Sequence, residues 1–117
     1  MIVLAQLSLN TVNVELNASL STSYWLFHFE MDDLNGTELS YYITPTSSNE
    51  RYYSFEVDTT ANPMKTGEWV LKVFERPNED STDTDGLTAS LTAKVRIYKE
   101  FPSDYINTIT LTDYRLN

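Results

Sequence analysis

The chain contains no cysteine, and this absence excludes several kinds of chemistry. None of its 117 residues is a cysteine, so disulfide bonds, thiolate metal sites and cysteine nucleophiles are excluded. Small secreted domains usually depend on disulfides. Residues 2–7 are mostly apolar, but they lack a preceding basic region and are too short for a signal peptide. We therefore expect the protein to fold in a cytoplasm.

Basic residues are also scarce. Eight Lys and Arg residues stand against 17 Asp and Glu residues, which gives a net charge of −9. Binding to a nucleic-acid backbone requires a basic surface, and an anionic membrane surface repels an acidic protein for the same reason. No run reaches the roughly 18 apolar residues of a membrane-spanning helix. The composition therefore predicts neither a nucleic-acid partner nor a membrane partner.

Glycine and proline are few, at 3 and 4 residues. This composition argues against linkers and low-complexity segments. Apolar residues make up 41% of the chain and aromatic residues 13%, which is enough to build a hydrophobic core. We expect a single domain over residues 1–117.

Three stretches alternate bulky apolar and polar side chains, at residues 24–31, 51–57 and 68–75. A period of two is typical of a strand that packs one face against a core. Together with weaker runs, these stretches predict about eight strands. We expect them at residues 2–9, 11–17, 23–31, 39–45, 51–58, 68–76, 87–99 and near 105–112.

Turn signals and strand spacing indicate the fold class. Asn35-Gly36 separates two alternating runs, which predicts a tight hairpin. Trp25 lies on the third predicted strand, where immunoglobulin-like folds often bury an aromatic residue. We therefore predict an all-β chain that forms a single antiparallel β-sandwich of immunoglobulin-like type. A jelly roll or a small barrel is the alternative.

Candidate catalytic residues are few. His28 is the only histidine, so a Ser-His-Asp relay would have to use it, but its aromatic neighbours favour a packed or sheet-face position. Glu30, Asp32 and Asp33 are the only candidates for an acidic pair, and a hairpin tip is a poor place to exclude water. We therefore predict that the protein is not an enzyme.

Calcium is the best metal hypothesis. Asp83 and Asp85 lie in an Asp-Thr-Asp-Gly run that resembles the middle of a calcium-binding loop, and Glu79 and Asp80 add carboxylates nearby. The first ligand position would be Ser81 and the twelfth Thr92, so the motif fails at two points. Residues 77–86 are more simply a polar hairpin loop. No cofactor is predicted, and calcium binding stays open.

The chain has 8 tyrosines, which suggests an aromatic surface. Exposed tyrosines on one sheet face could stack on sugars or anchor a protein interface. The alternative is that half of them belong to the core and the others pair across strands. The sugar-binding hypothesis requires Tyr24, Tyr42, Tyr52 and Tyr114 to gather on one exposed surface.

Residues 105–117 combine a strand-like pattern with apolar side chains that are costly to expose. They either complete the domain's own sheets or add to the sheet edge of a neighbour as an assembly arm. Residues 1–9 are predicted to complete the domain's own sheets. The candidate interface residues are Tyr105, Ile106, Ile109, Leu111, Tyr114 and Leu116.

The order of motifs over residues 23–76 resembles small β-sandwich virion proteins of tailed phages, particularly those of Bacteroidetes hosts. An aromatic strand ending in Phe-x-Phe at 27–29 precedes an Arg-Tyr-x-x-Phe strand at 51–55. A Gly-x-Trp strand beginning at 67 follows and ends in an aromatic-Glu pair. The resemblance implies a structural part of a virus particle, either a capsid auxiliary protein or an adaptor in the tail or fibre.

Two functions follow as hypotheses. The first is a non-enzymatic virion assembly protein that binds other virion proteins or copies of itself, forms part of an oligomeric assembly, and reaches the virion after folding in the host cytoplasm. The second is a carbohydrate-binding β-sandwich module that uses exposed tyrosines, with or without calcium.

Overall fold

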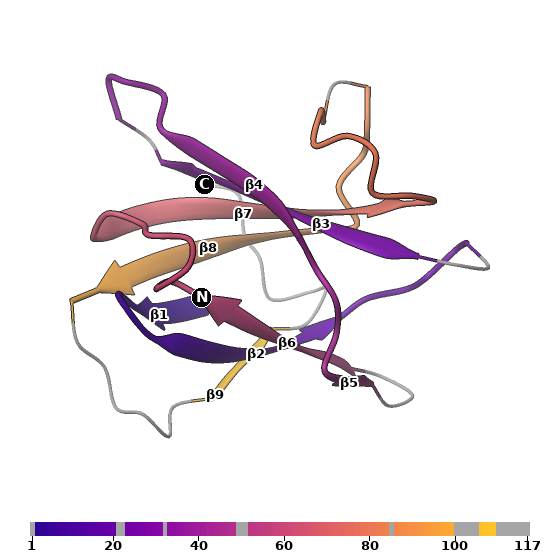
Figure 1. Ribbon diagram of the computed structural model, residues 1–117, viewed down its shortest axis with the longest axis horizontal. Coiled ribbons are helices and arrows are strands. Elements are labelled where there is room, and N and C mark those ends of the chain that lie inside the picture. Colours follow the sequence, from indigo (N-terminus) through magenta and orange to yellow (C-terminus); the bar gives the residue numbers. More distant parts are fainter. Residues whose placement is uncertain are drawn as a thin grey trace.

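The alternating runs form strands in the computed structural model (Figure 1), which describes residues 2–20, 23–31, 33–48, 52–84, 86–99 and 106–109. For 106–109 only the course of the backbone is described. This part of the chain contains strands and no helix. The strands are β1 (Ile2–Ala5), β2 (Leu9–Glu15), β3 (Tyr24–Met31), β4 (Glu38–Ile43), β5 (Ser47–Ser48), β6 (Tyr52–Asp58), β7 (Gly67–Arg76), β8 (Leu91–Tyr98) and β9 (Ile106–Ile109).

The strands form two sheets around one core, so the prediction of an all-β, sandwich-like chain is confirmed. One sheet has the order β1-β8-β7-β3-β4 and the other the order β5-β6-β2-β9. In Figure 1, β2, β6, β5 and β9 lie below β3, β4, β7 and β8. The strongest alternating run, β3, lies between β7 and β4 in the five-stranded sheet.

Two strand pairs in the described part of the chain are parallel, so the prediction of an antiparallel sandwich was wrong for these pairs and correct for the other five. β1 pairs parallel with β8, and β9 pairs parallel with β2. Both pairs are made by strands near the ends of the described chain. Each such strand joins the sheet opposite to that of its neighbour in sequence, because β1 and β2 lie in different sheets, as do β8 and β9. A crossing between sheets, unlike a tight hairpin, allows a parallel pair.

The inward-facing side chains are those that the alternation predicts. Trp25, Phe27 and Phe29 of β3 are almost fully buried. Phe27 packs edge-on against Phe55 of the other sheet, with ring centroids 4.8 Å apart, and Trp25 packs in the same manner against Tyr53 at 5.5 Å. Aromatic pairs prefer this geometry, and the two contacts join the sheets face to face.

The tight hairpin at Asn35-Gly36 is confirmed, but only the glycine has a positive φ among its described residues. Gly36 has a φ of 60°, and its N–H donates to the Asp33 carbonyl. The Asp33 carboxylate accepts hydrogen bonds from the Thr37 N–H and hydroxyl, at 2.9 and 2.6 Å. The hydrogen bonds from Thr37 lower the pKa of Asp33. This carboxylate therefore stabilises the turn.

Several predicted strand boundaries were wrong. The strand predicted at 11–17 spans Leu9–Glu15, the strand predicted at 39–45 spans Glu38–Ile43, and the short strand β5 was not predicted. The strand predicted at 87–99 begins at Leu91, and Leu87 is exposed. The strand predicted at 2–9 ends at Ala5, since residues 6–8 carry the chain from one sheet to the other.

Candidate functional site

The predicted C-terminal interface lies partly in β9. Ile106 pairs with Thr11 of β2, and Ile109 pairs with Val14. The structure therefore places 106–109 at a sheet edge of the same chain. Tyr105, Leu111, Tyr114 and Leu116 lie outside the described residues. Their role in an interface stays a prediction.

The attachment of β9 is narrow. The pairing with β2 extends over four positions, and the other strand that β9 approaches is β1. β2 is itself firmly held, because β6 pairs with it over seven positions and Val12 and Val14 are buried in the core. β6 thus pairs with one edge of β2 and β9 pairs with the other. β9 is the edge strand of its sheet in the described part of the chain.

His28 lies on the outer face of the five-stranded sheet, the face that carries Leu26, His28 and Phe74 and is opposite to the core. Its Nδ1 contacts the Ser40 hydroxyl, and its Nε2 lies 3.3 Å from Glu30 and 3.6 Å from Glu38. Lys72 Nζ lies 3.2 Å from the same Glu30 oxygen. The prediction of a sheet-face position is confirmed, and the contacts of His28 are those of a cross-strand polar cluster.

The acidic candidates do not converge. Glu30 belongs to the His28 cluster, Asp33 caps the hairpin turn, and Asp32 lies outside the described residues. The prediction that the protein is not an enzyme stays a prediction.

Loop 77–90 joins β7 to β8, and its described part around Ser81 and Asp83 binds side chains of the outer face. The Tyr42 hydroxyl donates to the Ser81 carbonyl at 2.5 Å, and burial raises the pKa of this hydroxyl. Arg76 donates to the Asp83 carbonyl at 2.9 Å and approaches the Asp80 carboxylate at 3.7 Å. These contacts attach the loop to β4 and β7.

Two side chains on the outer face are buried although they do not belong to the main core. Leu26 and Phe74 face each other in register on the outer face and are 0% and 4% exposed. Tyr42, which is bonded to the loop, is the register neighbour of Leu26 on its other side. The sequence analysis missed this packing. The sequence feature that could have predicted it is Leu26, an apolar residue on the polar face of an alternating strand.

The part of the chain that the structure describes contains no set of side chains that could bind calcium. Three or more His, Asp or Glu side chains placed to hold a metal ion are not found there, and Asp85 lies outside it. Ser81 and Asp83 use their carbonyl groups to hold the loop.

The candidate tyrosines do not share one surface. Tyr24 and Tyr42 lie on the outer face of the five-stranded sheet, whereas Tyr52 lies on β6 of the other sheet, opposite Glu15. Tyr114 lies outside the described residues. Sugar stacking would therefore involve at most Tyr24 and Tyr42 among the three described tyrosines.

No protein-family model, curated protein or solved structure matches this chain. Within the described ranges, no helix is long and apolar enough to span a membrane.

Proposed function

We propose that this protein is a non-enzymatic assembly component of a tailed-phage virion that acts by protein–protein contacts, with the edge at β2 and β9 as its main assembly element. The observation that carries the proposal is the origin of the strand at this edge. A strand from the far end of the chain, and not a neighbour in sequence, pairs with β2. Main-chain pairing at a sheet edge is a common way to join separate chains.

The proposal includes an immunoglobulin-like type of sandwich. This type of fold identifies which strand ordinarily occupies the edge beside β2. In that fold one sheet contains strands C, F and G, and the other contains A, B, E and D, with A beside B. The order β4-β3-β7-β8 corresponds to C′, C, F and G, and β2-β6-β5 corresponds to B, E and D. The place of strand A beside β2 is then taken by β9, because the N-terminal strand β1 has joined β8.

Two tryptophans agree with this type of fold. Trp25 is buried on β3, the strand that corresponds to C, where immunoglobulin domains bury a tryptophan. Trp69 lies near the start of β7, and its Nε1–H donates to the Lys65 carbonyl at 3.0 Å. A tyrosine of immunoglobulin domains makes an equivalent bond to the preceding backbone at the same corner.

The place beside β2, which β9 of the same chain occupies, suggests how copies join. The edge of β2 requires a strand, and residues 105–117 can supply it within their own chain or to a second copy. Shape and main-chain complementarity would carry the assembly, and the resemblance of residues 23–76 to phage virion proteins supports a structural role.

The first test compares the full chain with a chain that ends at Phe101, by size-exclusion chromatography with light scattering. We expect the full chain to assemble and the shortened chain to be a folded monomer by circular dichroism. Two compact monomers would contradict self-assembly through this segment.

A peptide of residues 102–117 sharpens the test. Added to the shortened chain, it should bind and raise the thermal stability. The matched control carries Asn107→Pro and Thr108→Pro, because proline cannot donate a main-chain hydrogen bond and successive N–H groups of a strand point to opposite sides. Equal binding by both peptides would contradict main-chain pairing at β2.

A further inference from the structure

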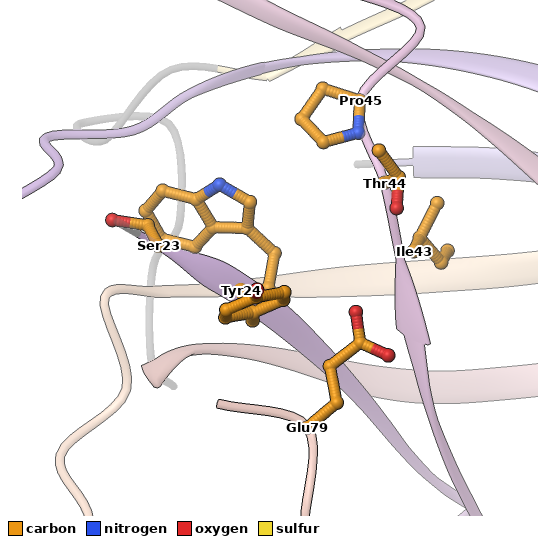
Figure 2. Close-up of a pocket in the computed structure, with 7 residues that line it drawn as sticks. Ser23, Tyr24, Ile43, Thr44, Pro45 and Glu79 are labelled. Atoms are coloured by element: carbon orange, nitrogen blue, oxygen red, sulfur yellow. The ribbon is translucent and has the colours of Figure 1, made fainter. Parts of the chain in front are cut away.

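A small pocket lies where β3 begins, β4 ends and loop 77–90 passes (Figure 2). Its lining residues are Ser23, Tyr24, Trp25, Ile43, Thr44, Pro45 and Glu79, and the pocket has a volume of about 90 Å³ and opens to solvent. Tyr24 is 36% exposed here, while Ser23 is fixed by a 2.5 Å hydrogen bond from its hydroxyl to Glu75. The walls therefore include the Tyr24 ring and the apolar side chains of Ile43 and Pro45.

Glu79 supplies the charge of the pocket. Figure 2 shows its carboxylate directed toward the space between Tyr24 and Ile43. Within the described residues, no hydrogen bond or ion pair engages this carboxylate, whereas the neighbouring Asp80 approaches Arg76. The loop that carries Glu79 is attached through the Ser81 and Asp83 carbonyls, so its backbone places Glu79 beside the pocket, and no ion pair among the described residues neutralises this exposed carboxylate.

This combination suits one kind of group. A lysine or arginine side chain has an aliphatic stem that packs on apolar surface and a cationic head that binds a carboxylate or the face of an aromatic ring. The net charge of −9 favours the approach of a basic partner. A neutral sugar would gain from the ring but not from the charge.

We propose that the pocket between Tyr24, Ile43, Pro45 and Glu79 binds a lysine or arginine side chain of a partner protein. The inference rests on the proposed function, since it names the chemistry of one partner contact. The site lies on the five-stranded sheet, away from the edge at β2 and β9.

The test uses the ¹⁵N-labelled full chain and small probes in NMR titrations. Nα-acetyl-lysine methylamide should shift the amide signals of Tyr24, Thr44 and Glu79, and added salt should reduce the effect because ions screen an exposed pair. The uncharged norleucine analogue should shift them less. Glu79→Gln should weaken lysine binding roughly three- to fivefold, the range of an exposed ion pair.

The matched control is Glu56→Gln, which removes an exposed carboxylate from β6 of the other sheet. It should leave lysine binding unchanged. Equal shifts with lysine and norleucine probes, or an equal effect of the two Gln variants, would overturn the inference. Shifts with methyl glucoside but not with lysine would replace it with sugar binding, and no shift with any probe would refute the site. Because this experiment does not depend on assembly, its failure leaves the C-terminal test of the proposed function intact.

Discussion

At the scale of single residues, a few polar groups fix places that the hydrophobic pattern leaves undefined. Trp69 is 3% exposed, and its indole N–H closes the corner before β7 by a bond to the Lys65 carbonyl. Glu75, at the other end of β7, accepts bonds from the Ser19 and Leu20 backbone N–H groups and from the Ser19 and Ser23 hydroxyls. The two side chains fix the loops at opposite ends of one strand.

Replacing Trp69 by phenylalanine should cost more stability than the same change at Trp25. Both substitutions remove similar buried volume, but Trp69→Phe also leaves a backbone carbonyl without its donor, while the Trp25 indole N–H has no hydrogen bond within the described residues. We expect the difference to be about 1 kcal/mol in the free energy of unfolding, measured by urea denaturation. Equal losses would show that the corner bond contributes nothing.

The acid dependence of stability should involve Glu75. Burial alone would raise its pKa, but hydrogen bonds from Ser19, Ser23 and Leu20 outweigh this effect and lower the pKa. A carboxyl with a lowered folded-state pKa stabilises the fold above its ordinary pKa, near 4.5, and loses this effect as pH falls through the lowered value.

Glu75→Gln should therefore lower the free energy of unfolding by about 1 kcal/mol at neutral pH. This gap in the free energy of unfolding between the unsubstituted protein and the variant should become smaller in acid. Urea denaturation over a pH series measures the gap, and Glu56→Gln, on the other sheet, is the matched control. A gap that is constant with pH would show that the charge of Glu75 is not what matters.

At the scale of elements, the crossing between β1 and β2 defines the topology. The Asn10 side chain pairs with both the N–H and the carbonyl of Ala5, at 2.9 and 3.1 Å, and reaches the Val57 carbonyl of β6 at 3.2 Å. The fully buried Thr59 hydroxyl donates to the Ala5 carbonyl at 2.6 Å. Hydrogen bonds thus join the end of β1, in one sheet, to β2 and to the end of β6 in the other sheet.

Asn10→Ala should loosen this crossing and cost about 2 kcal/mol, because partly buried backbone groups of Ala5 lose a partner. Thermal or urea unfolding checks the loss, and hydrogen exchange at the amides of β1 should increase first. Asn17→Ala, at an exposed position, is the control. An unchanged exchange rate in β1 would contradict the role given to Asn10.

At the scale of the whole molecule, the excess of acidic residues gives the protein a large negative net charge. The net charge is −9 at pH 7. It reaches zero near pH 4.3, the isoelectric point, as the carboxylates become protonated. Repulsion between molecules keeps acidic proteins apart and disappears at the isoelectric point.

Light scattering of the shortened chain that ends at Phe101 should rise as pH approaches the isoelectric point and decrease again with further acid. The shortened chain separates this effect from assembly through residues 105–117. Scattering that does not depend on pH would show that charge repulsion is not what keeps the molecules apart.

The sequence by itself determined most of the strands and their inward faces. Alternation in β3, β6 and β7 selects one face of each strand because a core has room only for apolar side chains, and Gly36 marks the hairpin because, among the described residues of the turn, it adopts a positive φ. These are local properties, so a single chain shows them.

Only the tertiary structure decided which strands pair and which side chains bind loop 77–90. The parallel places of β1 and β9 depend on contacts far apart in sequence. The sequence of loop 77–90 predicts a polar hairpin loop, and only the structure shows that Tyr42 and Arg76 bind it at the Ser81 and Asp83 carbonyls. The pocket at Tyr24 and Glu79 exists for the same reason, because it brings together a strand and a loop that no local pattern relates.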